Sequence, residues 1–437
     1  MTTLADQPTH PFRIANFRAY WTARLTLTLA QYAMLLIIGW QTYNLARDAG
    51  MSVGEASGQL ALIGLLQFVP LFLLTPFTGL AADRFDRRNL GRLMVLLQLL
   101  CAATLALFTW SDAIGLPVLY SVAIVLGIAR AFAGPAFSAL APNLVPKAVL
   151  PNAIALSSIA WQVGMIVGPA VGGIMYEIIP ALPYAVAAAL FAVSAIALTF
   201  IGHVPRGSPR STDKPLRQIR EGLVYVMQNK MVLGAITLDL FAVFLAGATA
   251  LFPVYARDIL QVGASGLSQL AMAPAIGAAL TALWFSFSPL RNNVGPKMLA
   301  AVAIFGAATI VFGLSKSMPL SLAMLFIVGA ADMFSVYIRQ SLIQLHTPDD
   351  KRGRVSAVSL MTISASNEFG DFFSGSLAFL IGPVAAVVAG GAGAIVTVVA
   401  WTGLFPVLRT TRTFDPPEEL LEEKMNVPNT DPAKEGA

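Results

Sequence analysis

Long apolar segments alternate with short polar ones along nearly the whole 437-residue chain. A helix needs about 20 apolar residues to cross the hydrocarbon core of a bilayer. The strands of a membrane barrel would instead alternate polar and apolar residues, and these runs do not. The pattern predicts an all-α membrane protein with twelve transmembrane helices. We expect these helices near residues 20–45, 59–82, 90–110, 117–140, 153–177, 182–202, 231–256, 266–288, 297–315, 319–340, 355–380 and 384–408.

The composition agrees with this pattern and excludes a soluble domain. The chain is 57% hydrophobic and 12% charged, whereas a soluble globular chain carries about 25% charged residues. The single cysteine, Cys101, rules out an intrachain disulfide. The net charge of +5 would suit nucleic-acid binding, but the positions of the basic residues favour a membrane protein.

The basic residues are distributed unevenly between the two sides. Arg47, Arg257 and Lys316 fall in loops on one side and Arg130 falls inside a span, while the rest lie on the side of the N-terminus or near that surface. The positive-inside rule then places both termini in the cytoplasm. We expect a multi-pass protein of a bacterial inner membrane that is surrounded by lipid and acts as a monomer.

The longest internal break divides the chain into two halves. We expect a six-helix half at residues 1–202, a cytoplasmic linker at 203–230, a second six-helix half at 231–408 and a cytoplasmic tail at 409–437. Leu216, Ile219, Leu223 and Val226 recur in the linker at helical spacing. This predicts an amphipathic helix in the headgroup layer, with a solvated linker helix as the alternative.

A sparse internal repeat supports two pseudo-symmetric halves. The segments 127–173 and 329–375 align without a gap. The matching positions are Gly127 with Gly329, Phe132 with Phe334, Pro146 with Pro348, Ser157 with Ser359, Gly168 with Gly370, and Gly173 with Gly375. Transporters built from parallel repeats hold substrate near the midplane between the halves.

A charged loop between the second and third helices carries the first recognisable motif. It reads Gly79-Leu80-Ala81-Ala82-Asp83-Arg84-Phe85-Asp86-Arg87-Arg88. This resembles the signature loop of the major facilitator superfamily, although Asp86 stands where the wider superfamily has glycine. Asp83 can pair across helix ends, and Arg87 and Arg88 can anchor to anionic headgroups. The resemblance implies a cytoplasmic gate formed by Gly79, Asp83, Arg84, Arg87 and Arg88.

The fifth helix carries a glycine-proline run. It comprises Gly164, Gly168, Pro169, Gly172 and Gly173. Small residues four apart let helices pack closely, and proline adds a kink point. The run resembles the superfamily's export motif and favours efflux, while plain tight packing is the alternative.

Three further segments narrow the resemblance to one branch. They are Asn16-Phe17-Arg18-Ala19-Tyr20-Trp21, Asn143-Leu144-Val145-Pro146 and the run from Leu345 to Val355. These look like the branch that contains enterobactin exporters and macrolide efflux pumps. The resemblance implies export of a siderophore or drug-like molecule in exchange for protons.

Charged residues inside spans are functional candidates because burying a charge in lipid is costly. We expect Asp239, Asp332, Glu368 and Asp371 to include the proton carrier, with Asp239 favoured because its own helix has no basic neighbour. Arg130 lies near the midplane, and the repeat places Asp332 at the equivalent position. Asp332 is thus expected to neutralise Arg130 or Arg339, or to bind an ionic substrate with Arg130. Glu368 and Asp371 alternatively face water.

Polar residues in apolar helices complete the candidate list. Gln31, Tyr32, Gln67 and Gln162 either line the substrate cavity or form interhelical hydrogen bonds. No metal-ligand spacing and no phosphate-binding loop is present, so we expect no metal, cofactor or direct use of ATP. The sequence predicts a proton-coupled exporter of a small organic molecule. An importer or facilitator of the same fold, or a membrane-embedded enzyme, are the alternatives.

Overall fold

The computed structural model describes residues 10–84, 86–202, 215–288, 290–348 and 351–415, and it contains helices and no strand within these ranges. The first half of the chain contributes α1 (Ala15–Asp48), α2 (Val53–Arg84), α3 (Arg87–Trp110), α4 (Leu116–Leu140), α5 (Leu150–Ile178) and α6 (Leu182–Thr199). The second half contributes α7 (Pro215–Gln228), α8 (Lys230–Leu245), α9 (Phe252–Val254), α10 (Gly263–Phe287), α11 (Val294–Leu314), α12 (Met318–Leu345), α13 (Arg352–Ile381), α14 (Pro383–Leu404) and α15 (Pro406–Thr410).

Eleven segments of the described chain are long and apolar enough to cross a membrane. The expected span near 355–380 is not among them. It corresponds to α13, of which Phe369–Ile381 is a shorter apolar segment within the described residues. Within residues 355–380 the sequence carries several serines together with Asn367, Glu368 and Asp371, which lower its apolar content.

The seventh expected span, 231–256, corresponds to the apolar segment Lys230–Ile259, but it is not one unbroken helix. The chain leaves α8 at Leu245, passes through a 3-10 turn at Thr249–Leu251 and α9, and ends in a π-helical turn at Tyr255–Ile259. Pro253 has no backbone N–H to continue an α-helix. Gly247 lies against the backbone of Gly370 and the side chain of Ser374, where a Cβ would be crowded.

The buried apolar side chains form two large clusters and a shared one. The first cluster draws only on residues 12–201, and the second only on residues 225–414. A third cluster combines Trp40, Tyr43 and Ala56 with residues such as Tyr255 and Phe312. The two parts of the chain therefore have separate cores and one common interface.

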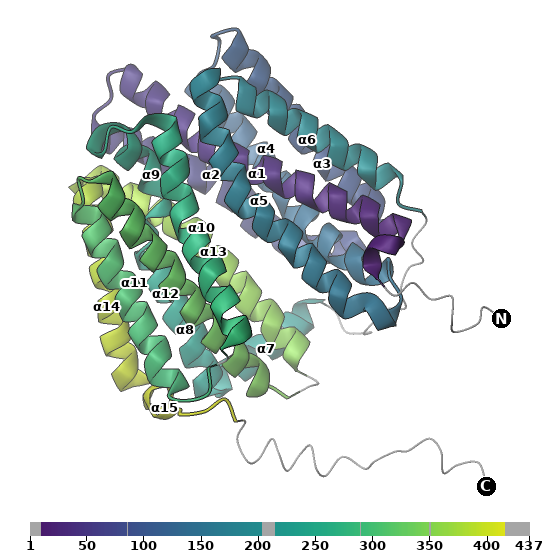
Figure 1. Ribbon diagram of the computed structural model, residues 1–437, viewed down its shortest axis with the longest axis vertical. Coiled ribbons are helices and arrows are strands. Elements are labelled where there is room, and N and C mark those ends of the chain that lie inside the picture. The colour runs from purple at the N-terminus through teal and green to yellow at the C-terminus, as the bar shows by residue number, and fades with distance from the viewer. Residues whose placement is uncertain (1–9, 85, 203–214, 289, 349–350, 416–437) are drawn as a thin grey trace, which may run out of the picture.

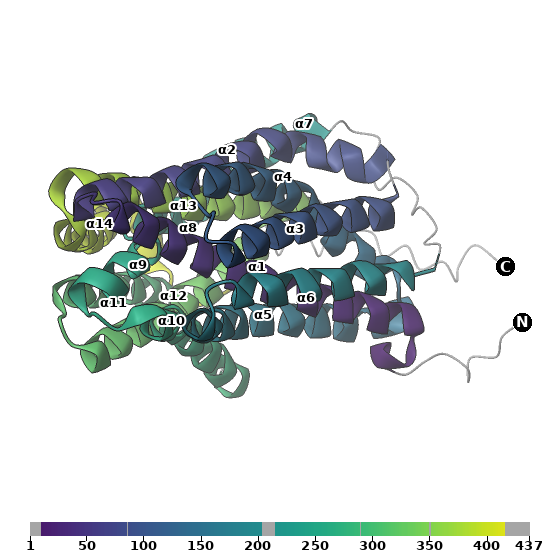
Figure 2. The ribbon, with the colours of Figure 1, turned by 90° about the horizontal axis from the view of Figure 1, so that it is seen from above.

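The common interface lies at one end of the molecule. We call the end where α1 reaches Asp48 the Asp48 face, and the end where α1 begins and α14 finishes the terminal face. Both groups of helices leave the α9 region in Figure 1 and diverge toward the terminal face. Figure 2 shows α9 and the start of α6 at the Asp48 face, with the first turn of α1 at the other end.

Glycines that the sequence repeat pairs together lie at corresponding helix crossings. Gly127 of α4 lies against the backbone of Gln67 in α2, and Gly329 of α12 lies against the backbone of Pro274 in α10.

The same holds for the later pairs. Gly168 of α5 approaches α1 at Leu29, and Gly370 of α13 approaches α8 at Phe244. Gly173 of α5 meets α10, and Gly375 of α13 meets α2. At each crossing an added Cβ would lie within 3.2 Å of the neighbouring helix, which is closer than ordinary packing.

Helix α7 docks on the second cluster. Val226 is 3% exposed and belongs to that cluster with Val355 and Val358, so this member of the expected lipid-facing stripe packs on protein. Leu223 remains exposed, whereas the side chains of Leu216 and Ile219 lie outside the described part.

Polar contacts hold α7 against the loop between α12 and α13. Glu221 pairs with Arg354 at 3.0 Å, and the Tyr225 hydroxyl donates to the His346 carbonyl at 3.0 Å. The ammonium of Lys351 lies 5.2 Å from the centre of the Tyr225 ring. Burial lowers the pKa of the His346 imidazole below its usual range.

Candidate functional site

Asp239 and Arg339 form an ion pair in the interior of the second half. Asp239 lies on α8 and Arg339 on α12, and their side chains are 9% and 3% exposed. Asp239 is nine residues into α8, or about 14 Å along its axis. The hydrocarbon core is about 30 Å thick, so the pair lies near the middle of the membrane-spanning part.

This pair corrects two expectations. Asp239 has no basic neighbour on its own helix, yet α12 supplies one across the bundle. Arg339 is neutralised by Asp239 and not by Asp332, which lies two turns away on the same helix as Arg339. Sequence spacing within one helix cannot reveal a partner that the tertiary fold brings in.

The surroundings of the pair are polar but sparsely bonded. Trp401 donates to the Thr237 hydroxyl at 3.1 Å, and Ser366 donates to the Leu240 carbonyl at 2.9 Å. Within the described residues, Arg339 Nε and Ser359 Oγ are buried without a hydrogen-bond partner. The charge on Asp239 is therefore the chief compensation for the buried guanidinium.

Arg130 and Asp332 are not joined. Arg130 donates to the Gln67 side chain at 3.2 Å, which ties α4 to α2. In the part of the chain that the structure describes, Asp332 forms no ion pair with Arg130 or Arg339. The expectation of a symmetry-related pair is wrong because the two repeats use their equivalent positions differently.

The polar cavity candidates mostly take part in interhelical contacts. Gln31 of α1 donates to Gln98 of α3 at 2.6 Å, and Gln67 accepts from Arg130. The ring of Tyr32 packs edge-on against Trp161, with centroids 6.3 Å apart. Gln162 is half-buried on α5. Interhelical bonding, one of the two readings, thus describes Gln31 and Gln67.

Asp371 lies at the interface between the two parts. It accepts a hydrogen bond from Thr249 at 2.9 Å, just after the break in α8. A Cβ added at Gly64 of α2 would lie 4.0 Å from the Asp371 Cβ, so α2 passes beside Asp371 at ordinary contact distance. The side chain of Glu368, the other proton-coupling candidate on α13, is outside the described part.

Sequence reasoning missed a chain of phenylalanines beside Asp371. Phe68 of α2 contacts Phe369 of α13 with ring centroids 5.7 Å apart, and Phe369 stacks on Phe244 of α8 at 5.6 Å. The series links both parts of the molecule. Only the tertiary contacts distinguish these residues among 26 phenylalanines.

The charged loop begins α3 and ties it to α6. Asp86 caps α3 by accepting from the Arg88 backbone N–H at 2.9 Å. Arg88 donates to the Ile201 carbonyl at 2.8 Å, and Arg92 donates to the Leu198 carbonyl. Arg88 therefore binds a backbone carbonyl of the protein, a contact that the expected anchoring to lipid headgroups did not include. The side chains of Asp83 and Arg84 and the surroundings of Gly79 lie outside the described part, and Arg87 is half-buried.

The glycine-proline run of α5 lies against two neighbours. Gly164, Gly168 and Gly172 approach α1, and Gly173 approaches α10. Ser268 of α10 accepts from the Gly173 N–H at 3.0 Å and donates to the Pro169 carbonyl at 2.7 Å. The run thus packs α5 closely and also carries a contact between the two parts.

Sequence reasoning also missed a cross-link at the Asp48 face. Arg47 of α1 pairs with Asp258 of the π-helical turn at 3.0 Å. The Tyr43 hydroxyl donates to the same carboxylate at 2.5 Å.

A second, crossed pair lies beside it. Arg257 pairs with Asp48 at 2.6 Å and donates to the carbonyl of Asn44 at 3.1 Å. We call Tyr43, Asn44, Arg47, Asp48, Arg257 and Asp258 the latch. Arg47 and Arg257 belong to helical turns and not to loops as expected. Their rarity as basic residues on that side was the available signal.

Comparisons with known proteins agree with this architecture. Residues 6–427 match the family model described as transmembrane secretion effector. The multidrug efflux pump Tap of Mycobacterium tuberculosis H37Rv is 28% identical over 350 residues, which are 77% of this chain and 78% of that protein. The enterobactin exporter EntS of Escherichia coli O1:K1 is 25% identical over 394 residues, or 89% and 90% of the two chains.

Solved transporters share the fold at low sequence identity. A D-xylose-proton symporter has a TM-score of 0.67 at 13% identity, covering 87% of this chain and 96% of that one. A bacterial homologue of the human lysosomal transporter Spinster, in an inward-facing and unoccupied conformation, has a TM-score of 0.65 at 17% identity, covering 90% and 96%. The family and these relatives are membrane transporters and not enzymes. With the helical architecture and a family match over nearly its whole length, this chain belongs to the transmembrane secretion effector family of the major facilitator superfamily.

Proposed function

We propose that this protein exports a small organic molecule, siderophore or drug-like, across a bacterial inner membrane in exchange for protons. The relatives named as a multidrug efflux pump and an enterobactin exporter support the direction and the substrate class. The buried Asp239–Arg339 pair is the observation that carries the coupling step. The alternative is an importer or facilitator with the same fold.

Asp239 is proposed as the proton carrier. A carboxylate that pairs with a buried guanidinium holds its charge, and protonation removes that compensation. Arg339 must then find another anionic or polar partner, which favours rearrangement of α8 against α12. Because α8 ends six residues beyond Asp239, movement there can reach the latch. Asp371 is the second candidate, since it lies at the interface and contacts Thr249.

Two six-helix halves are proposed to rock about a site between them. The separate cores and the matched glycine crossings support this division. The linker 203–230 and both termini are proposed to be cytoplasmic, as the basic residues indicate. The Asp48 face is then the outer side, and the ion pairs of the latch support the proposal that it holds this face closed. Asp83, Arg84, Arg87 and Arg88 are proposed to close the cytoplasmic side in the other state, with Gly79 allowing close helix approach.

Substrate is proposed to bind near the midplane, in contact with Arg130, Gln67 and the phenylalanine series. Gln31, Tyr32 and Gln162 remain proposed cavity residues. The protein is proposed to function as a monomer in lipid.

The test measures proton movement and binding separately. In proteoliposomes, Asp239→Asn is expected to abolish proton-driven transport and to retain binding of a transported dye or siderophore. Asp332→Asn is the matched control, because Asp332 is an embedded acid without the Arg339 contact, and it is expected to keep coupling. Asp239→Asn leaves the charge of Arg339 buried without its partner and can impair folding. The double variant Asp239→Asn with Arg339→Gln removes both charges, so a loss of proton coupling in it is not caused by the stranded charge.

Each outcome assigns the carrier. Wild-type proton stoichiometry in Asp239→Asn would disprove the assignment, and loss of coupling in Asp371→Asn would move it to α13. Substrate accumulation in right-side-out vesicles, and not in inside-out vesicles, would establish an importer instead.

A further inference from the structure

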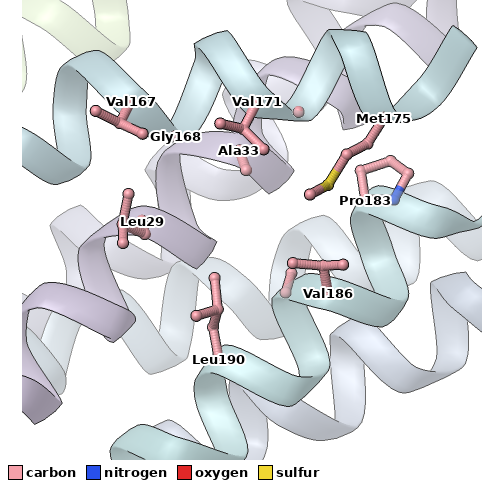
Figure 3. A pocket seen from close by; sticks show the side chains of 11 residues that line it. Leu29, Ala33, Val167, Gly168, Val171, Met175, Pro183, Val186 and Leu190 are labelled. Atoms are coloured by element: carbon pink, nitrogen blue, oxygen red, sulfur yellow. The ribbon is translucent and has the colours of Figure 1, made fainter.

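An apolar groove opens on the outer surface of the first half, between α5 and α6. Its volume is about 150 Å³. The side chains in Figure 3 converge on it from three helices, with α1 forming the floor. The lining includes Leu29, Val167, Val171, Met175, Val186 and Leu190, and none of its side chains carries nitrogen or oxygen.

The glycine run explains why the groove exists. Gly168 and Gly172 draw α5 onto α1, where the Cβ of a larger residue would meet the α1 backbone. Both α5 and α6 pack along α1, but they touch one another over only a short length. The space between them is therefore left by the backbone arrangement, and no described side chain fills it.

The position of the groove along the helices shows whether it opens to water or to lipid. Met175 is three residues from the end of α5, and Pro183 is the second residue of α6, so the groove lies in the half of the span nearest the Asp48 face. Val167 and Val171 are each 38% exposed at its edge. These segments cross the membrane, so the groove opens to hydrocarbon.

We infer that this groove binds one acyl chain of a phospholipid from the leaflet at the Asp48 face. An apolar space of about 150 Å³ stays dry and accepts a hydrocarbon guest. An empty space would forfeit dispersion contacts along its walls. The lining offers nothing to a headgroup or an ionic solute, while a methylene chain matches it. The bound chain pads α5 against α6 and supports the close α1–α5 crossing.

The experiment uses the full chain in nanodiscs that contain phosphatidylethanolamine with a diazirine near the end of one acyl chain. Photolabelled positions are mapped by peptide mass spectrometry as the fraction of photolipid is raised. Labelling of residues 167–175 and 183–190 is expected to saturate. Labelling at Val396 and Val399 of α14, which are 65% and 67% exposed, is expected to rise in proportion to the photolipid.

A filling variant and its control make the test specific. Val171→Trp is expected to lower groove labelling at least about threefold, because the indole occupies the space. Val163→Trp is the matched control, since Val163 lies on the same helix, is also 38% exposed and does not line the groove. It is expected to leave groove labelling unchanged.

A second pair covers the case in which Val171→Trp does not fold. Val186→Phe fills the groove from α6, and Val193→Phe is its control on the same helix. Groove labelling that stays proportional to photolipid, or that survives in the filled variant, would overturn the inference. Both outcomes are independent of transport, so they do not depend on the proposed function.

Discussion

At the residue scale, the most consequential feature is a charge pair that sequence spacing could not find. Asp239 and Arg339 lie 100 positions apart in the chain and meet in the core. Removing one partner of a buried pair leaves an uncompensated charge and costs about 3–5 kcal/mol. Removing both leaves no stranded charge.

A double-mutant cycle measures this coupling. Asp239→Asn and Arg339→Gln are each expected to lower thermal stability strongly, and the double variant is expected to be more stable than their sum predicts. The control cycle is Arg130→Gln with Asp332→Asn, which form no pair in the described structure and should add within about 0.5 kcal/mol. The opposite result would show additive stability losses at Asp239 and Arg339 and coupled losses at Arg130 and Asp332. That result would assign the ion pair to Arg130 and Asp332.

The buried His346, at the junction with α7, leads us to expect that the free energy of unfolding depends on pH. Its imidazole is buried, and burial lowers its pKa below the unfolded value of about 6.5. The unfolded chain then binds more protons than the folded one as the pH falls below about 6.5, so the free energy of unfolding decreases there. The Nδ1 atom lies 3.1 Å from the Leu342 carbonyl.

Thermal unfolding in detergent between about pH 7.5 and pH 5.5 tests this linkage. His346→Gln keeps an amide that can donate to Leu342 and is expected to flatten the decline. An unchanged pH profile in that variant would assign the decline to other groups.

At the element scale, glycines set the distances between helices. Gly127 and Gly329 each lie against the backbone of a neighbouring helix. Adding a Cβ there must push the helices apart, and overpacking typically costs about 1–3 kcal/mol. Because the two crossings correspond through the repeat, their responses should be similar.

Gly127→Ala and Gly329→Ala are therefore both expected to lower the melting temperature. Gly134 of α4 is the matched control, since a Cβ added at this position would meet no atom within 4 Å. Gly134→Ala should stabilise the helix by up to about 1 kcal/mol, because alanine has the higher helix propensity. Tolerance of alanine at Gly127, measured by thermal unfolding beside Gly134→Ala, would contradict the close crossing.

At the scale of the whole molecule, the latch joins the two parts at the Asp48 face. Each ion pair is partly exposed and contributes little alone, but the crossed arrangement with Tyr43 forms a network. The latch must break if that face opens. Asp258→Asn is expected to shift the population toward the state open at the Asp48 face.

Spin labels at Ala113→Cys and Lys316→Cys report this shift, because both positions are exposed at the Asp48 face and Cys101 is buried. The distance between labels is expected to lengthen in Asp258→Asn. The charge swap Arg47→Asp with Asp258→Arg should restore the shorter distance. No change in Asp258→Asn would show that other contacts hold this face closed.

The apolar pattern by itself determined the class of protein and the approximate positions of eleven membrane-length segments. Hydrocarbon admits only segments that bond their own backbone, so length and composition are sufficient to locate them. The signature residues Gly79–Arg88 and the glycine run of α5 were likewise readable because their spacing is local. These features resemble the superfamily, and the family match agrees with them.

The partners of the buried charges were decided only by the tertiary structure. Asp239 meets Arg339 rather than remaining alone, Arg130 meets Gln67 rather than Asp332, and Arg47 meets Asp258 across the interface. The break after Leu245 was equally hidden, because the residues around it continue the apolar run of the span. Periodicity records which face of a helix is buried, whereas a charge pair depends on how two helices are placed and rotated against each other. That placement follows from close packing across the whole molecule, which no local pattern contains.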